Sequence, residues 1–321
     1  MPSSPNEAAA SETIIPAQKG NISGSTWPNR RKMWRFWGGA FFGIALLSAF
    51  AMPLLALINY AARSQLYSYI LLVPFISAYL LYLRRDQLRK TCVTDLPLAV
   101  ISLAAGLGVL VVIFSLNLIG QRPSDNDRLA LWALSFLCCL GAGGFFFFGR
   151  GWMRAAAFPL TYLIFMVPMP DVMADALETA SKYASAEVAN LLFHLSGTPF
   201  LRAGLIFQLP NITIEVAQEC SGIRSSWVLL MTSILAANLF LKTPWRRFAL
   251  VAFVIPLAIL RNGFRILVIG LLCVHMGPQM IHSLIHRRGG PLFFILSLIP
   301  FLAVLWWLHR GDSRARQPKS L

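Results

Sequence analysis

One cysteine has charged neighbours on both sides, in the segment Val-Ala-Gln-Glu-Cys-Ser-Gly-Ile-Arg-Ser-Ser, residues 216–226. The apolar pattern predicts a helix that begins directly after Glu219, so Cys220 would occupy its first turn and Arg224 the next turn of the same face. Unpaired N–H groups, the helix dipole and a nearby cation all favour a thiolate, although Glu219 works against it. Cys220 is therefore a candidate nucleophile. For the other cysteines we expect inert, buried thiols: Cys92, Cys138, Cys139 and Cys273.

Two arginines lie inside a later apolar run, in the segment Leu-Arg-Asn-Gly-Phe-Arg-Ile, residues 260–266. An arginine at the centre of a bilayer costs about 2.5 to 3.5 kcal/mol on insertion scales. Counting from the basic residues that precede this run places Arg265 near the outer membrane boundary and Arg261 one turn deeper on the same face. Because Asn262 is also costly there, a single arginine reaching for the interface does not explain the segment. A role in binding a polar group explains the segment better.

Two histidines, His282 and His286, lie four residues apart in the segment before the last apolar run. A zinc site is a weak interpretation, since the glutamate of a His-Glu-x-x-His motif and an obvious third ligand are both missing. A general acid or base fits better, because imidazole titrates near neutral pH. No glycine-rich phosphate loop is present either, so the sequence predicts neither a metal nor another cofactor.

The composition places these residues in a membrane. Hydrophobic residues make up 57% of the 321 residues and charged residues 13%, and the mean hydropathy is +0.64, which is far above the values of water-soluble domains. The formal net charge of +15 would suggest nucleic acid in a soluble protein. Here the basic residues cluster beside apolar runs, so they indicate membrane topology and no nucleic-acid partner. The odd number of cysteines, without a Cys-x-x-Cys pair, indicates neither a disulfide framework nor a zinc ribbon.

The apolar runs predict an all-α polytopic membrane protein with about eight transmembrane helices. The expected spans are residues 36–60, 67–83, 97–118, 129–149, 155–170, 221–241, 247–274 and 290–308. Lys and Arg cluster at every second junction, within residues 30–35, 84–90, 150–154, 242–247 and 310–319. Because basic loops stay in the cytoplasm, both termini are expected there.

The long outer segment predicts two further elements. Residues 171–196 follow a helical pattern but are too polar to span, so we expect a helix that lies in the interface. Residues 205–217 contain two β-prone runs around a Pro-Asn turn and predict a short hairpin before the cysteine helix. Residues 1–28 lack periodicity and predict a disordered cytoplasmic tail, and residues 311–321 predict a basic cytoplasmic tail. The membrane-embedded domain would then comprise residues 29–310.

Three separate segments thus present Cys220, Arg265 and a histidine at the same outer face. A nucleophilic thiol, a fixed cation for an oxyanion and a proton shuttle are the groups that acyl transfer through a thioester requires. Their mutual distances do not follow from the sequence.

These motifs resemble those of the exosortase/archaeosortase family of polytopic membrane transpeptidases. The resemblance rests on Cys220-Ser-Gly-Ile-Arg224, on Asn262-Gly-Phe-Arg265, and on His286 followed by Gly290 and a Phe pair at residues 293–294. It extends to Ile164-Phe-Met-Val-Pro-Met-Pro170 and to residues 197–216, and covers about residues 150–300. It selects His286 over His282 and Arg265 over Arg261. The segment Gly289-Gly290-Pro291 departs from the family pattern, in which an aromatic residue commonly follows the glycine.

The resemblance implies a cysteine-dependent enzyme of a bacterial inner membrane, with its active site toward the periplasm. Its partners would be membrane lipids and exported proteins that end in a short recognition motif, an apolar helix and a basic tail. Cys220 would attack the scissile carbonyl, Arg265 would stabilise the oxyanion or hold the substrate, and His286 would move the proton. Arg224 would orient the thiol. The polar residues beside Arg265 would bind or orient the substrate: Arg261 and Asn262.

Two other functions are compatible with parts of the sequence. A transporter or flippase could use Arg224, Arg261 and Arg265 to bind an anionic lipid-linked substrate. It would leave Cys220 and His286 without roles, and the spans show no obvious internal repeat. A non-catalytic assembly factor for polysaccharide export could keep the same fold with an idle site.

Overall fold

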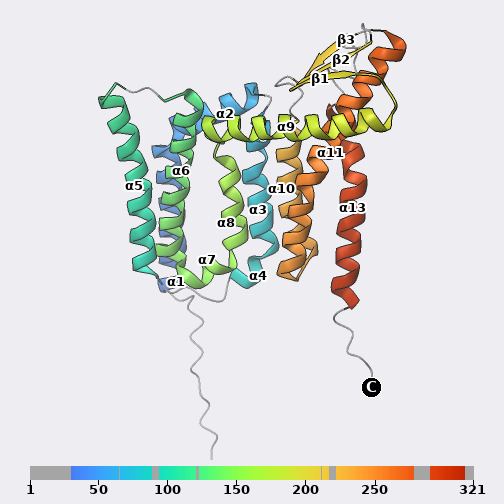
Figure 1. The fold of residues 1–321 in the computed structure, drawn as a ribbon. Helices are drawn as coiled ribbons and strands as arrows, with labels where there is room; N and C mark the ends of the chain where they lie inside the picture. Colours follow the sequence, from blue (N-terminus) through green and yellow to red (C-terminus); the bar gives the residue numbers. More distant parts are fainter. Residues whose placement is uncertain are drawn as a thin grey trace, which may run out of the picture.

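The structure, a computed structural model, describes residues 30–64, 66–88, 94–120, 123–210, 212–216, 222–277 and 290–314. Most of these residues are helical, and many helices stand upright, side by side (Figure 1). The upright helices are α1 (Arg30–Ala49), α3 (Val73–Leu83), α5 (Leu96–Leu118), α6 (Asp125–Gly143), α8 (Ala157–Tyr162), α10 (Ile223–Phe240), α11 (Pro244–Met276) and α13 (Gly290–Arg314). Shorter helical elements connect them: α2 (Ala51–Arg63), η1 (Ser68–Leu71), α4 (Arg85–Leu88), η2 (Gly144–Phe148), α7 (Gly149–Ala155) and η3 (Leu163–Met166).

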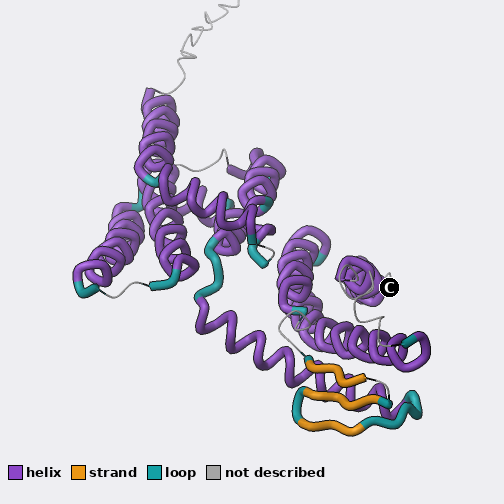
Figure 2. The backbone as a smooth tube through the Cα atoms, turned by 90° about the horizontal axis from the view of Figure 1, so that it is seen from above, coloured by secondary structure: helices purple, strands orange, loops and turns teal. Residues whose placement is uncertain are grey.

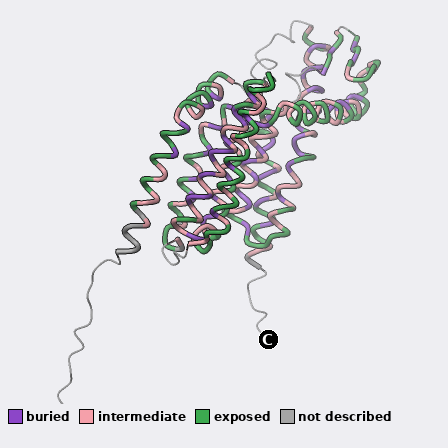
Figure 3. Tube along the Cα trace, turned by 90° about the vertical axis from the view of Figure 1, so that its left-hand side faces the viewer, coloured by how far each residue is buried: buried purple, intermediate pink, exposed green. Residues whose placement is uncertain are grey.

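Exposed positions recur along the upright helices (Figure 3), and many of them carry large apolar residues, as in membrane spans. In α5 only 17% of the most apolar stretch is buried, so this helix meets lipid on most of its surface. In α11 the buried share is 56%, so other elements of the protein cover much more of α11 than of α5. The chain is therefore a multi-pass membrane protein, and α11 has the largest buried share of the five long apolar helices that the structure describes.

The expected count of eight spans is not confirmed. Within the described residues, five helices are long and apolar enough to cross a membrane, or up to seven if each bent helix pair forms one span. The expected span 67–83 corresponds to the shorter apolar helix Ser68–Leu83. The expected spans 36–60 and 155–170 belong to the bent pairs, which break by 66° and 87°. Apolar composition locates these segments but does not reveal where their helices bend.

The break within the first expected span has a local cause. Helix α1 ends at Ala49 and α2 begins at Ala51, with Pro53 in its first turn. Proline has no N–H to donate to the carbonyl four residues earlier, and its ring crowds that carbonyl, which here is the carbonyl of Ala49. Pro53 therefore favours a break of the helix at this point.

Helix α9 (Asp171–Leu195) lies across the ends of the upright helices, as expected for the interfacial segment (Figure 1). Seen from above, α9 links a group of helices at the N-terminal side of the chain with the group α10, α11 and α13 (Figure 2). A small sheet packs beside the far part of α9. The ends of α1 and α13 that carry the chain termini lie at the opposite end of the molecule (Figure 1).

The sheet contains one strand more than the sequence predicted. Strands β2 (Ile206–Leu209) and β3 (Ile212–Glu215) form the expected antiparallel hairpin, with Phe207 opposite Ile214. Strand β1 (Leu201–Ala203) adds to the free edge of β2 through Gly204, whose φ of +62° allows the tight turn. Three residues with an arginine at the centre are too short to produce an alternating apolar pattern.

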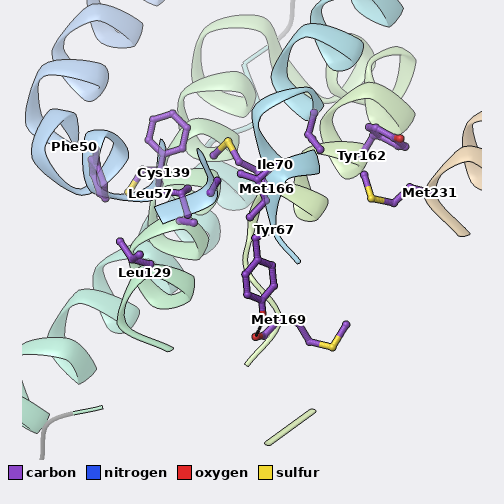
Figure 4. Close-up of a cluster of buried hydrophobic side chains, with 14 of the residues drawn as sticks. Phe50, Leu57, Tyr67, Ile70, Leu129, Cys139, Tyr162, Met166, Met169 and Met231 are labelled. Carbon is purple, nitrogen blue, oxygen red and sulfur yellow. Dashed lines mark hydrogen bonds between the residues drawn. The ribbon is translucent and has the colours of Figure 1, made fainter. Parts of the chain in front are cut away.

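The two helix groups share a buried contact. Tyr162, Met166 and Met231 belong to one apolar cluster, although Met231 comes from α10 (Figure 4). Trp227 of α10 lies 5.9 Å from the ring of Phe165, centroid to centroid. These contacts seat α10 against the N-terminal group of helices.

Candidate active site

The turn into α9 is held by polar contacts from three other segments. The carbonyl of Met169 accepts a hydrogen bond from Tyr67 Oη at 3.1 Å and from Asn126 Nδ2 at 2.7 Å. The backbone N–H of Asp171 donates to Asp127 Oδ1 at 2.9 Å, which satisfies one free donor of the helix start. The Pro-Met-Pro segment in the family resemblance thus has a structural role, which is to set the direction of α9.

Helices α9 and α11 cross at very short distance because α11 carries glycines at the contact. A Cβ on Gly263 would lie 2.5 Å from Val188 Cγ1 and 3.1 Å from the backbone nitrogen of Ala189. A Cβ on Gly270 would lie 2.6 Å from the ring of Phe193. The small residues let the two backbones approach. As a result, the buried hydroxyl of Ser185 accepts a hydrogen bond from Asn262 Nδ2 at 3.0 Å.

The sheet is anchored to the same two helices. Phe207 and Val216 are buried with Phe193 of α9 and Ile266 of α11. Arg202 of β1 donates two hydrogen bonds to Glu187 of α9, at 2.7 and 3.0 Å. This contact lowers the pKa of Glu187 below its usual value. The chain is therefore fixed at Val216, shortly before the cysteine segment.

Helix α10 begins three residues later than the sequence predicted. Its first residue is Ile223, and Gly222 before it has a φ of +66° in the left-handed region. A left-handed residue cannot belong to a right-handed helix, so the expected start of α10 at residue 220 is wrong, and Cys220 itself lies outside the described residues. A Cβ on Gly222 would lie 2.7 Å from Asn262 Oδ1, so this position requires glycine for its φ and for its packing.

Arg261 joins α11 to the start of α10. Its side chain is buried, with 7% of the residue exposed. Arg261 Nη2 donates to the carbonyl of Gly222 at 3.2 Å and to Ser226 Oγ at 2.9 Å. Arg261 Nη1 is also buried and has no hydrogen-bond partner among the described residues. Asn262, the next residue, is 2% exposed and lies against Gly222.

The structure brings some of the predicted site residues together and leaves others outside what it describes. Arg261 and Asn262 meet the segment that follows the cysteine, as the shared site requires. Arg265 is half-buried one turn further along α11, and Arg224 is exposed on α10. Cys220 lies outside the described residues, as do His282 and His286. The meeting of thiol, guanidinium and imidazole therefore stays a prediction.

Sequence reasoning missed three residues of this site. Ser185 and Ser226 accept hydrogen bonds from Asn262 and Arg261, yet serines within helices carry no sequence signal. Gly222 had a signal, because a glycine in the first turn of a predicted helix can adopt the left-handed conformation that moves the helix start. Cys139 and Cys273 are buried, as expected for inert thiols, whereas Cys138 is half-buried and Cys92 lies outside the described residues. Among the residues that the structure describes, no group of three or more His, Cys, Asp or Glu is arranged to hold a metal ion.

Comparison with protein families decides what this arrangement belongs to. A family model described as transmembrane exosortase matches residues 61–303, about three quarters of the chain. This chain belongs to the transmembrane exosortase family. The match takes in α9, the sheet, α10 and α11, and so contains the whole candidate site of this exosortase. Comparisons with curated proteins and with solved structures gave no match.

Proposed function

We propose that this exosortase is a membrane cysteine peptidase that acts as a transpeptidase on exported proteins. Its substrates end in a recognition motif, an apolar helix and a basic tail, and they are cleaved near the motif and transferred to a surface acceptor. The observation that carries the proposal is the hydrogen bond from Arg261 to the Gly222 carbonyl at 3.2 Å. It ties the segment after Cys220 to the segment that contains Asn262 and Arg265, so two of the three motifs of the predicted site are adjacent.

The proposed reaction has two halves. The Cys220 thiolate attacks the scissile carbonyl carbon, and Arg265 stabilises the resulting oxyanion. The C–N bond then breaks, the leaving amine takes a proton from His286, and a thioester remains on Cys220. In the second half the acceptor nucleophile gives its proton to His286 and attacks the thioester. The acyl group passes to the acceptor, and the thiolate returns.

The position of the site supports this assignment. The start of α10 lies below α9, which crosses the ends of the upright helices, so the site is near one membrane boundary (Figure 1). A substrate held by its own apolar helix would present the adjacent motif at this depth. Restricting the substrate to the membrane plane would then supply much of the positioning that a deep cleft supplies in soluble enzymes. We place this boundary at the periplasmic face of a bacterial inner membrane.

The proposal is tested by following a co-produced reporter with such a C-terminal tail in a pulse-chase experiment. Cys220→Ala and Cys220→Ser are expected to abolish processing, since neither variant can form the thioester. Cys138→Ser is the matched control, because Cys138 is a free, half-buried cysteine in α6, far along the chain from the site. Processing by Cys220→Ala at the parent rate would reject the thiol as nucleophile.

A transporter for an anionic lipid-linked substrate would also have a use for the buried Arg261. Such a transporter would have no use for Cys220. A thiol reagent applied from the outside separates the two functions, since a transporter of this kind should tolerate it and the proposed enzyme should lose activity in proportion to Cys220 labelling. A non-catalytic assembly factor would process no reporter at all.

A further inference from the structure

Arg261 is a buried cation that the proposed reaction does not use. It precedes the Asn-Gly-Phe-Arg segment and lies one turn from Arg265 on α11. With 7% of the residue exposed, its guanidinium has left both water and lipid headgroups. A buried charge is unfavourable unless its N–H groups find acceptors. The acceptors of the Arg261 guanidinium therefore indicate its role.

One guanidinium nitrogen holds the turn that follows Cys220. Arg261 Nη2 donates to the Gly222 carbonyl at 3.2 Å and to Ser226 Oγ at 2.9 Å. The same carbonyl accepts from the backbone N–H of Ser226 at 3.0 Å, in the first turn of α10. On the other side, the Cα of Gly222 packs so closely on Asn262 that a Cβ would come within 2.7 Å of Oδ1. Two neighbouring residues of α11 therefore fix the backbone two positions after the cysteine.

The other terminal nitrogen is buried and has no hydrogen-bond partner in the part of the chain that the structure describes. Guanidinium donates five N–H bonds in a rigid plane, and Arg261 Nη1 contributes two of them. A buried donor that is left unpaired in a native protein calls for a specific acceptor. Because Nη1 belongs to the same planar group as Nη2, an acceptor on Nη1 lies close to the Gly222 turn, which follows Cys220 by two residues in the sequence. A backbone carbonyl oxygen is the one acceptor that every polypeptide substrate offers.

We propose that Arg261 positions Cys220 through the Gly222 carbonyl and, through Nη1, binds a backbone carbonyl oxygen of the substrate beside the scissile bond. This inference rests on the proposed function. Arg265 and Arg261 would then have separate roles. Arg265 stabilises the oxyanion, and Arg261 orients both the nucleophile and the peptide that the nucleophile attacks. Lysine cannot reproduce it, because a single ammonium lacks the planar fork that reaches two sites at once.

The test uses the full chain with Cys220 as its single cysteine, the other four replaced by alanine. Two properties are measured in Arg261→Lys and Arg261→Gln: the pulse-chase rate of reporter processing, and the rate of Cys220 alkylation by iodoacetamide between about pH 6 and 9. The control pair is Arg247→Lys and Arg247→Gln. Arg247 is in the same helix and also donates to a backbone carbonyl, that of Leu241, at the opposite end of the molecule.

Both Arg261 variants are expected to slow processing about 10- to 100-fold, the usual cost of a misplaced reacting group. They should also change the pH midpoint of Cys220 alkylation, which a residue that only supports the fold would leave unchanged. The Arg247 variants should match the parent in both measurements. If Arg261→Gln does not accumulate, Arg261→Lys decides, because it keeps the charge.

Processing within twofold of the parent, together with an unchanged alkylation profile, would overturn the inference. That result is distinguishable from a failure of the proposed function, since Cys220→Ala is measured in the same assay. If Cys220→Ala still processed the reporter, the proposed function would be wrong. The alkylation profile would still decide whether Arg261 positions the thiol.

Discussion

The residues around the start of α10 fix one another through a short network of polar contacts. Asn262 donates to Ser185 of α9 and packs on Gly222, while Arg261 holds the Gly222 carbonyl and Ser226. The contact with Ser185 joins α11 to α9, and the other contacts join α11 to the start of α10. The backbone after Cys220 therefore depends on side chains from elsewhere in the chain as much as on its own sequence.

Replacing Gly222 with alanine tests this dependence. The substitution forces an L-residue into a left-handed conformation and places its Cβ 2.7 Å from Asn262 Oδ1, so reporter processing should fall at least about 10-fold. Gly204→Ala is the matched control, since Gly204 has a φ of +62° and no heavy atom of the described residues lies within 4 Å of the place that a Cβ would occupy. Gly204→Ala therefore introduces the same backbone strain but no contact with Asn262. Equal effects of the two substitutions on processing would show that the contact with Asn262 has no importance.

Replacing Arg265 with lysine tests the geometry of the proposed oxyanion contact. The charge is kept, but the planar fork is lost, so we expect processing to fall about 100-fold or more. The protein should accumulate normally, which immunoblotting of membranes checks. Processing at the parent rate would mean that charge alone suffices at this position.

The sequence predicted the polar residues of this site better than their arrangement. Arg261 and Asn262 were recognisable because polar residues inside an apolar run are costly. Ser185 was not, because a serine on a helix has the same local sequence whether its hydroxyl meets water or Asn262. Contacts between distant segments depend on helix packing, and one sequence alone does not reveal that packing.

At the scale of elements, the crossing of α9 and α11 decides where the site forms. Gly263 and Gly270 are on α11 at the places where Val188, Ala189 and Phe193 of α9 make contact. Without this close approach, Ser185 would not reach Asn262. Helix α9 therefore lines the site and also connects the two helix groups.

Adding one methyl group at this crossing should loosen it. In Gly263→Ala the new Cβ would lie 2.5 Å from Val188 Cγ1, and overpacking of this kind costs about 1–3 kcal/mol. We expect a lower unfolding temperature in detergent and slower processing. Gly108→Ala in α5 is the control, because no described residue comes within 4 Å of its Cβ and alanine favours the helix. Similar unfolding temperatures for the two variants would contradict a tight crossing.

Element types were more predictable than element boundaries. The polarity of residues 171–196 identified α9, and the Pro-Asn turn identified β2 and β3. The sequence placed the helix start at residue 220 because apolar periodicity does not report backbone handedness, whereas Gly222 in the left-handed region moves the start to Ile223. The bend between α1 and α2 was missed for a similar reason, since Pro53 interrupts the helix without interrupting the apolar run.

The whole molecule has a polar site end and a basic end. At the end opposite α9, Asp312 of α13 accepts from the backbone N–H of Lys242 at 2.7 Å and from Arg246 Nη1 at 2.9 Å. Arg84 donates to Asn238 of α10 at 2.8 Å and so joins the two helix groups at the same end. Basic residues that flank spans favour the cytoplasmic side. The site end is then expected to face outward.

This orientation is testable by thiol labelling in intact cells. In a chain without its native cysteines, Asp175→Cys on α9 should react with a membrane-impermeant maleimide added outside. Asp86→Cys on α4, where the side chain is 84% exposed, should react only after the cells are opened. The opposite pattern would reverse the orientation and place the site in the cytoplasm, where exported substrates could not be processed.

If Cys220 carries the substrate as a thioester during the reaction, that intermediate can be isolated. Enzyme from cells that produce the tailed reporter is quenched in acid, digested and analysed by mass spectrometry. We expect a peptide containing Cys220 with the carboxyl-terminal residues of the cleaved reporter attached, and release of this adduct by neutral hydroxylamine. A substrate adduct on any other side chain, while the reporter is being cleaved, would contradict this role of Cys220.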